Sequence, residues 1–268
     1  MKIQRRQLGG IEYYVQVDEQ DDIVMLSQSL ELLMQGRGLH ARHLIEKIRS
    51  KDGKILSPVP VGKILAIGLN YRAHAEESGK TLPSEPLIFL KPASAVIAHL
   101  EPIILPVQSQ EVHYEGELAV IIGKKAKDVS PQEAMKHVLG YTILNDVTAR
   151  DLQRKDGKYT RAKGFDTFAP IGPCFVTDLD PAEATIETRV NHELRQNSPC
   201  NDMIFSIPEL IAFVSSIMTL HPFDILTTGT PPGVGPITHG DTVKITIPGI
   251  GTLENPVIHK NFGKNHQK

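Results

Sequence analysis

The stretch that most constrains the fold is residues 113–122, with the sequence HYEGELAVII. Its last five residues are all apolar, which is typical of a strand that is buried on both faces. Side chains alternate along a strand, so Glu115 and Glu117 are expected on one face, about 7 Å apart along the chain. Gly116 between them leaves room on the opposite face for a close neighbour. The pattern therefore predicts one strand from about Val112 to Ile122, in a sheet core with two carboxylates at its edge.

Other segments alternate between short strand patterns and short helical patterns. Strands are predicted at residues 63–68, 87–90, 141–147, 243–247 and 251–257. A short polar helix is predicted after Asn70, which is a good N-cap, and it continues to about Ser78. Glycine (21 residues) and proline (19 residues) are scattered along the chain, which suits a loop-rich β protein better than a helical bundle. Together these patterns predict an α+β fold in which strands dominate.

The chain is expected to divide into two units and a tail. Residues 1–60 are predicted to form a small N-terminal α/β module, in which residues 11–17 (IEYYVQV) form a strand. Prolines in residues 56–60 (LSPVP) prevent a helix from continuing and mark a linker. Residues 61–258 are predicted to form the larger, strand-rich unit. Residues 259–268 carry three lysines and are expected to be a flexible basic tail.

Composition excludes several classes of protein. The chain has 29 Lys and Arg against 31 Asp and Glu, a formal net charge of -2, whereas nucleic-acid binding needs a basic face. No apolar run approaches the roughly 20 residues of a membrane-spanning helix. Two cysteines, Cys174 and Cys200, are too few for a disulfide framework, so a reducing compartment is expected. We therefore expect a cytoplasmic protein that binds neither nucleic acid nor membranes.

A third carboxylate follows another apolar strand. Residues 141–147 are largely apolar until Asn145 and Asp146, which places Asp146 in a position similar to that of the two glutamates. Carboxylates that gather at the end of a buried strand repel one another and need a cation. Three oxygen ligands without a thiolate suit a hard cation such as Mg²⁺. The residues alone also allow a simpler interpretation, in which the glutamates line a solvated strand edge and Asp146 caps a turn.

Further groups can carry acid–base or binding chemistry. His74 and Glu77 lie three residues apart and would share a helix face, where the carboxylate would raise the basicity of the imidazole. A helix-surface ion pair is the alternative interpretation. Lys163 fits either a desolvated catalytic amine or an ordinary surface lysine. The turn-rich loop at residues 228–235 (TGTPPGVG) offers hydroxyl and N–H groups that suit an anionic substrate.

In this order, these segments resemble the fumarylacetoacetate hydrolase family. The matching segments are KILAIGLNYRAHAEE (63–77), PLIFLKP (86–92), VHYEGELAVIIG (112–123), LNDVTARDLQ (144–153), AKGFDTFAPIGP (162–173) and LTTGTPPGVGP (226–236). The resemblance covers residues from about 60 to 258, and the ordered set of motifs is highly specific. It implies a β-dominated α+β fold, a mixed β-sandwich roll with the metal at its mouth, in a chain that assembles as a homodimer. A module like residues 1–60 occurs only in the longer relatives.

The resemblance also implies roles for individual residues. It implies metal ligands at Glu115, Glu117 and Asp146, a catalytic pair at His74 and Glu77 on a lid helix, an active-site lysine at Lys163, and substrate contacts at Arg150, Gln153, Thr230 and Lys91. Mg²⁺ is the implied ion, with Mn²⁺ or Ca²⁺ as alternatives.

The implied activity is that of a Mg²⁺-dependent hydrolase that cleaves a C–C bond in acylpyruvate-type 2-oxo acids. His74, oriented by Glu77, would activate water, and the pyruvate-like enolate would be stabilised by the metal and Lys163. Relatives with the same metal site isomerise or decarboxylate 2-hydroxymuconate-type diacids, or decarboxylate oxaloacetate, so these reactions stay open as alternatives. A Schiff-base aldolase built on Lys163 and a non-catalytic metal-binding protein are more distant alternatives.

Overall fold

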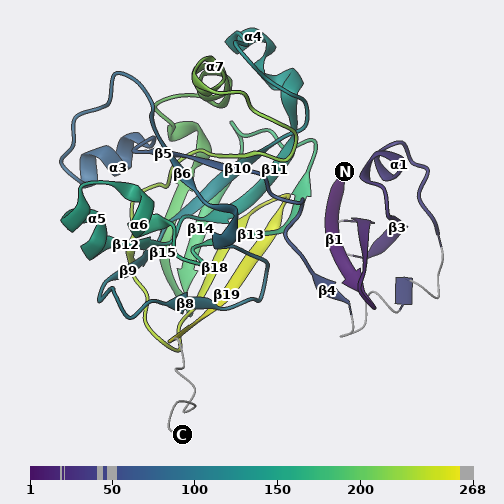
Figure 1. The fold of residues 1–268 in the computed structure, drawn as a ribbon, viewed down its shortest axis with the longest axis horizontal. Helices are drawn as coiled ribbons and strands as arrows, with labels where there is room; N and C mark the ends of the chain where they lie inside the picture. Colours follow the sequence, from purple (N-terminus) through teal and green to yellow (C-terminus); the bar gives the residue numbers. More distant parts are fainter. Residues whose placement is uncertain (19, 21, 41–44, 47–52, 260–268) are drawn as a thin grey trace, which may run out of the picture.

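The computed structural model describes residues 1–18, 20, 22–40, 45–46 and 53–259 (Figure 1). Strands dominate the fold and short helices lie around them, which confirms the predicted α+β class. The predicted tail lies outside the described residues apart from its first residue, His259. None of the described helices is long and apolar enough to cross a lipid bilayer.

The described strands form three sheets. The largest has 11 strands, and its main path has the order β3 (Ile23–Ser27), β2 (Ile11–Val17), β1 (Lys2–Leu8), β13 (Ala169–Val176), β11 (Val138–Asn145), β10 (Gly116–Ile122), β16 (Ile225–Thr227), β5 (Ile64–Gly68) and β6 (Leu87–Lys91). Beside this path, β4 (Lys54–Ile55) pairs with β1 and β7 (Val96–Ile97) pairs with β13. The second sheet has the order β15 (Glu193–Pro199), β14 (Thr185–Val190), β18 (Thr242–Ile247), β19 (Gly251–His259) and β8 (Ile103–Leu105). The third sheet has the order β12 (Thr148–Ala149), β9 (Val112–Tyr114) and β17 (Gly235–Pro236).

The helices whose bounds lie within the described residues are short. They are α1 (Leu30–Met34), α3 (Arg72–Glu77), α4 (Pro131–Ala134), α5 (Arg150–Asp156), α6 (Tyr159–Lys163) and α7 (Ile207–Ile217), with single 3-10 turns at Ala93–Ala95, Met135–His137 and Cys200–Asp202. Figure 1 shows α3, α5 and α6 together on one side of the molecule, next to β9 and β12.

Strand β10 lies within the large sheet, between β11 and β16, and every one of its residues is buried. Leu118, Val120 and Ile122 pack into one hydrophobic cluster. Ala119 and Ile121 pack into another cluster, as the alternation of side chains along a strand requires. The prediction of a strand buried on both faces is therefore confirmed.

The single strand predicted through residues 112–122 is interrupted at Glu115, so that prediction is wrong at this residue. β9 pairs with β12 and β17 in the small sheet, whereas β10 pairs with β11 and β16 in the large sheet. At the break the Glu115 N–H donates to the side-chain oxygen of Asn145 (3.0 Å), and the Glu115 carbonyl accepts from the Asp146 N–H (2.8 Å). These bonds fix the backbone at the point where the chain passes from the small sheet to the large sheet.

The first strand of the chain joins the N-terminal residues to the large sheet. β1 pairs with β2 and also with β13, where Ile3 lies opposite Phe175. The Ile3 side chain is fully buried and belongs to the same hydrophobic cluster as Phe175. Packing therefore couples the first strand to the larger unit, and the boundary near residue 60 stays a prediction.

Replacing Ile3 with alanine tests this coupling. We expect the free energy of unfolding to fall by about 2–5 kcal/mol, because truncation of a fully buried side chain leaves a cavity. Ile11→Ala on the neighbouring strand is the control, since Ile11 is 47% exposed and its loss should change stability by only about 0.5 kcal/mol. Urea unfolding followed by circular dichroism measures both variants. Equal effects of the two substitutions would contradict the coupling.

Candidate active site

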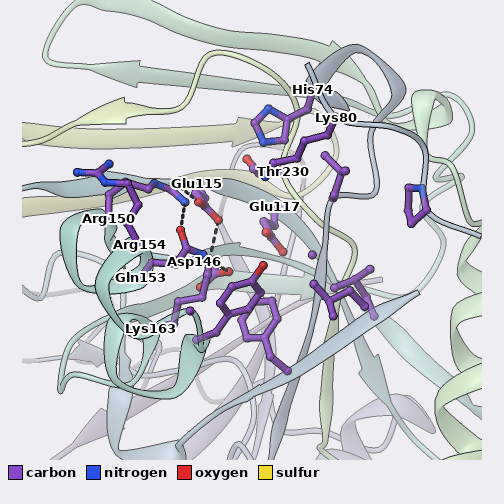
Figure 2. A pocket seen from close by; sticks show the side chains of 18 residues that line it. His74, Lys80, Glu115, Glu117, Asp146, Arg150, Gln153, Arg154, Lys163 and Thr230 are labelled. Carbon is purple, nitrogen blue, oxygen red and sulfur yellow. Dashed lines mark hydrogen bonds and ion pairs between the residues drawn. The ribbon is translucent and has the colours of Figure 1, made fainter. Parts of the chain in front are cut away.

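A pocket of about 560 Å³ opens where α3, α5 and α6 approach the start of β10 and the end of β11 (Figure 2). Its ionisable and polar lining consists of His74, Lys80, Glu115, Glu117, Asp146, Arg150, Gln153, Arg154, Tyr159, Lys163 and Thr230. The structure thus brings residues from six of the motif segments, or from close beside them, to one place.

Three buried carboxylates lie together at the bottom of this pocket. Glu115, Glu117 and Asp146 are 6%, 1% and 1% exposed, and one ligand atom from each lies within 4.8 Å of the others. Antiparallel pairing of β10 with β11 places Gly116 opposite Asn145, so Asp146 follows directly beside Glu115. The predicted grouping of these three residues, which we call the carboxylate cluster, is therefore present in the fold.

Lys163 contacts two members of the carboxylate cluster. Its ammonium donates to Glu115 (2.8 Å), to Asp146 (2.6 Å) and to the Thr148 hydroxyl (2.8 Å), so all three donors are used. Burial alone would lower the pKa of Lys163, but the charges of Asp146 and Glu115 raise it above its ordinary value. A charged amine has no lone pair with which to attack a carbonyl. This geometry argues against a Schiff-base aldolase.

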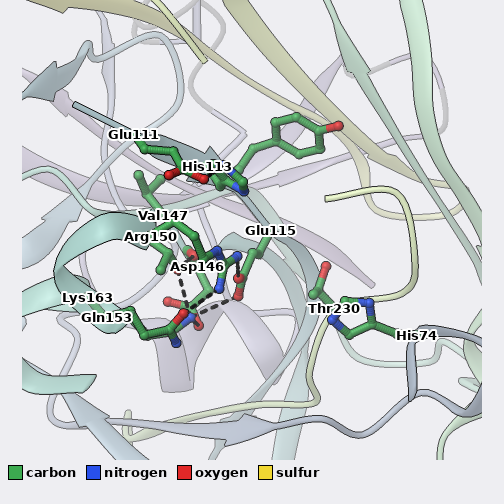
Figure 3. Close-up of polar contacts among 12 residues, drawn as sticks. His74, Glu111, His113, Glu115, Asp146, Val147, Arg150, Gln153, Lys163 and Thr230 are labelled. Atoms are coloured by element: carbon green, nitrogen blue, oxygen red, sulfur yellow. Dashed lines mark hydrogen bonds and ion pairs between the residues drawn. The ribbon is translucent and has the colours of Figure 1, made fainter. Parts of the chain in front are cut away.

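Arg150 is a second cation at the carboxylate cluster (Figure 3). Its guanidinium pairs with Glu115 and donates to the Gln153 side-chain oxygen (2.6 Å). Burial would raise the pKa of Glu115, but the charges of Lys163 and Arg150 hold that pKa at about 2. Glu115 is therefore ionised, and Arg150 and Gln153 hold each other at the wall of the pocket.

Lys91 is a third cation, and it lies behind the carboxylate cluster. It is 1% exposed and donates to Asp146 (2.6 Å) and to the Val147 carbonyl (3.3 Å). Burial lowers the pKa of Lys91, and the attraction of Asp146 offsets part of this effect. Lys91 does not line the pocket. The structure places it as a counter-ion of Asp146, whereas the resemblance implied a substrate contact.

Glu117 lacks the cationic partner that the other two carboxylates have. Its carboxylate accepts the Gly229 N–H (3.1 Å), and no Lys or Arg in the described part of the chain forms an ion pair with it. Burial and then the charge of Asp146 raise the pKa of Glu117 well above its ordinary value. A divalent cation would relieve this repulsion, and three carboxylates are the ligands that a hard cation prefers. The residues present therefore fit a divalent metal ion.

His74 and Glu77 form the predicted pair on α3. The Nδ1 atom of His74 lies 3.1 Å from a Glu77 carboxylate oxygen, and the other Glu77 oxygen accepts the Gly233 N–H (3.1 Å). Because a carboxylate accepts hydrogen bonds, Nδ1 carries the proton and Nε2 keeps a lone pair in the neutral ring. Figure 3 shows the ring beside Thr230. The arrangement can therefore supply a general base to the pocket.

The backbone of Gly233 holds the Glu77 carboxylate in place. Its φ is +92°, and an added Cβ would lie 2.0 Å from the Arg195 carbonyl oxygen, so only glycine fits here. The Gly233 carbonyl accepts the Tyr114 hydroxyl (2.6 Å). A chain of hydrogen bonds thus runs from Tyr114 through Gly233 and Glu77 to His74.

Gln196 is a supporting residue that the sequence analysis missed. Its amide nitrogen donates to the Thr230 hydroxyl (2.8 Å) and the Pro231 carbonyl (2.9 Å), and its oxygen accepts the Gly116 N–H (3.1 Å). A Cβ on Gly116 would lie 2.4 Å from the Thr188 hydroxyl and 3.1 Å from Gln196, which confirms the predicted close neighbour. That glycine was the only sequence signal of this contact. Gln196 fixes the loop that carries Thr230 against the start of β10.

Asn70 does not cap α3 as predicted, because Tyr71 occupies the N-cap position. The buried Asn70 amide donates to the Thr228 carbonyl (2.8 Å) and the Phe205 carbonyl (3.1 Å), and its oxygen accepts the Phe205 N–H (2.8 Å). The side chain thus ties the start of α3 to the loop that carries Thr230, and it is not available for capping.

Gly233→Ala tests the hydrogen-bond chain that orients His74. We expect the variant loop to shift, Glu77 to lose its N–H donor, and the His74 ring to populate both tautomers. Gly240→Ala is the matched control, because Gly240 has a similar φ of +94° but open space around its Cβ position. Imidazole ¹⁵N chemical shifts of labelled protein report the tautomer. An unchanged His74 spectrum in Gly233→Ala would contradict this role.

Comparisons with known proteins agree with this geometry. An X-ray structure of 5-carboxymethyl-2-hydroxymuconate delta-isomerase from Mycobacterium smegmatis matches with a TM-score of 0.83 and 44% identity, over 97% of this chain and 99% of that chain. A fumarylpyruvate hydrolase from Pseudomonas aeruginosa, solved in complex with Mn²⁺ and pyruvate, matches with a TM-score of 0.71 and 35% identity, over 79% of this chain and 94% of that chain.

A named relative and a family profile also match this chain. The oxaloacetate tautomerase fahd2, mitochondrial, of Xenopus laevis is 46% identical over 208 residues, which are 73% of this chain and 65% of the frog protein. The profile of the fumarylacetoacetate (FAA) hydrolase C-terminal domain matches residues 63–258, a range that contains the whole pocket. With this match, the shared fold and the ordered motifs, the chain belongs to the fumarylacetoacetate hydrolase family.

Proposed function

We propose that the protein is a divalent-metal-dependent enzyme that catalyses keto–enol proton transfer on a dicarboxylic 2-oxo acid such as oxaloacetate. The observation that carries this proposal is that one pocket holds both the carboxylate cluster and the His74–Glu77 pair. The frog relative named as an oxaloacetate tautomerase supports the substrate. The mycobacterial structure named as an isomerase supports proton transfer as the chemistry.

The charges at the bottom of the pocket favour a substrate that gains negative charge as it reacts. The carboxylate cluster is matched by three cationic side chains, Lys91, Lys163 and Arg150. Mg²⁺ is our proposed ion, and when bound it would supply two further positive charges and act as a Lewis acid toward the substrate oxygens. The 2-oxo acid end of the substrate carries one negative charge on its carboxylate and gains a second when its enolate forms. Lys163 and Arg150 are held charged and in place before the reaction, so they can stabilise that second charge without rearrangement.

His74 is the proposed acid–base residue. Glu77 holds the proton on Nδ1, which leaves Nε2 to take a proton from the carbon next to the carbonyl. One such group is sufficient for tautomerisation, because the proton removed from carbon can be returned to the enol oxygen. The reverse transfer uses the same atom.

Hydrolysis of acylpyruvates is the second candidate function. The His74 side chain is 17% exposed and that of Glu77 is 47% exposed, so water can reach the pair. The same Nε2 atom could then deprotonate a water that attacks the distal carbonyl, and the C–C bond would break as the enolate leaves. The structural neighbour named as a fumarylpyruvate hydrolase supports this candidate.

A substrate panel with product identification tests both candidates. Protein loaded with Mg²⁺ or Mn²⁺ is incubated in D₂O with oxaloacetate or acetylpyruvate and followed by NMR. Accelerated exchange of the carbon-3 protons of oxaloacetate without loss of carbon is the expected result. Release of acetate and pyruvate from acetylpyruvate would favour the second candidate, and release of CO₂ from oxaloacetate would identify a decarboxylase. No reaction with either substrate would contradict the proposed function.

Glu117→Gln tests the metal site. We expect the affinity for Mg²⁺ or Mn²⁺ to fall by about 100-fold or more, because loss of a direct ligand should exceed the effect of an outer-shell change. The metal-free protein should remain at least as stable, since the substitution removes repulsion from Asp146. Glu111→Gln is the control, because Glu111 pairs with Arg154 and lies outside the carboxylate cluster. Calorimetric titration measures all three proteins, and equal affinities would contradict the site.

His74→Ala tests the proposed base. We expect kcat to fall by about 100- to 10,000-fold, the usual contribution of a positioned general base. Metal affinity should not change, because His74 is not part of the carboxylate cluster. His192→Ala, at an exposed turn residue between β14 and β15, is the control. A His74→Ala enzyme with wild-type kcat would show that another group moves the proton.

A further inference from the structure

We propose that Lys80 is a specificity-determining residue whose ammonium binds the second, distal carboxylate of a dicarboxylic 2-oxo acid. This inference rests on the proposed function and names the residue that would select the substrate. None of the sequence motifs includes Lys80, which lies just after the segment that carries His74.

Lys80 differs from the other cations of the pocket because it has no carboxylate partner among the residues that the structure describes. Among the described residues, Lys or Arg side chains that line the pocket belong to Lys80, Arg150, Arg154 and Lys163. Arg150 and Lys163 pair with the carboxylate cluster, and Arg154 pairs with Glu111. No carboxylate of the described chain lies within ion-pair distance of Lys80. Its charge is therefore available to an anion in the pocket.

Lys80 lies where it can contact the end of a substrate that points away from the carboxylate cluster. Figure 2 shows Lys80 and Lys163 on opposite sides of the carboxylate cluster. The Lys80 side chain extends below the His74 ring toward Thr230. A substrate whose 2-oxo acid group binds at the carboxylate cluster would extend past His74, and a carboxylate at its other end would meet the Lys80 ammonium.

The backbone fixes Lys80 relative to the proposed base. The Lys80 N–H donates to the Ala75 carbonyl (2.9 Å), and Gly79 adopts a φ of +63° that ends α3. The Gly79 N–H donates to the Glu76 carbonyl (3.1 Å) in the same turn. Lys80 and His74 therefore belong to one hydrogen-bonded segment. If Lys80 binds the distal carboxylate, the carbon between the two ends of the substrate would lie near His74.

The charge balance favours a dicarboxylate over a monocarboxylate. With a divalent ion bound, the cations around the carboxylate cluster exceed its carboxylates by two charges, and Lys80 adds a third. The enolate of a dicarboxylic 2-oxo acid carries three negative charges, whereas that of a monocarboxylic one carries two. Only the dicarboxylic enolate balances all three excess positive charges. A monocarboxylic enolate would leave one positive charge unpaired, so we expect the site to discriminate against it.

Lys80→Met tests this inference through the ratio of kcat/KM for oxaloacetate to kcat/KM for acetylpyruvate. We expect the ratio to fall by about 10- to 100-fold, mainly through KM for oxaloacetate, which is the effect of losing one hydrogen bond to a charged group. Lys80→Arg keeps the charge and should restore most of the ratio. Lys125→Met, at an exposed lysine after β10, should keep the wild-type ratio. A ratio for Lys80→Met within threefold of wild type overturns the inference.

A binding measurement separates this inference from the proposed function. Malate and lactate are 2-hydroxy acids that differ only in the distal carboxylate, and neither can tautomerise as a 2-oxo acid does. Calorimetry of the Mg²⁺-loaded protein should show tighter binding of malate to the wild type and no such preference in Lys80→Met. If the wild type turns over neither substrate yet shows this preference, the proposed function fails and the Lys80 site stands. Equal preference in the two proteins overturns the Lys80 site, whichever reaction is catalysed.

Discussion

Three buried carboxylates lie at the bottom of the pocket, at the start of β10 and the end of β11. Burying an unpaired charge costs several kcal/mol, so such a cluster is tolerated only where cations meet it with good geometry. The cations come from β6 and from the consecutive helices α5 and α6, which lie about 60 residues further along the chain. The same ion pairs therefore dictate how these elements pack and give the pocket its shape.

The three carboxylates differ in their number of cationic partners, and this difference gives the site its chemistry. Glu115 and Asp146 each contact two cationic side chains, whereas Glu117 contacts none in the described structure. A site with one uncompensated carboxylate is a place for a cation, and the adjacent His74–Glu77 pair adds a base. The base is held through Gly233 and Tyr114, and Tyr114 directly precedes Glu115 in the sequence, so the chain itself links the support of the base to the carboxylate cluster.

Local patterns in the sequence indicated part of this arrangement, and the resemblance to the family was needed to choose between their alternative interpretations. The apolar run of β10 identified a buried strand, and the spacing of Glu115 and Glu117 placed them at its start. The spacing of His74 and Glu77 predicted their shared helix face. Each of these signals depends only on the residue's neighbours in the chain.

Features that depend on distant partners could not be predicted in this way. The break at Glu115 is made by bonds to Asn145 and Asp146, some 30 residues away. Gln196 supports Thr230 from a strand of another sheet, and no local pattern marks it. Lys80 stands out among the lysines that the structure describes because the fold places it at the pocket with no carboxylate partner in the described part of the chain. In each case the tertiary structure gives a common residue type its role.

The proposed chemistry depends on the binding of a divalent metal ion by the carboxylate cluster. Anomalous diffraction from crystals of the protein soaked with Mn²⁺ tests it most directly, because the signal identifies the ion and its position at once. We expect one strong peak between the carboxylates of Glu115, Glu117 and Asp146. A well-ordered pocket without such a peak, or a peak only at other residues, would contradict it.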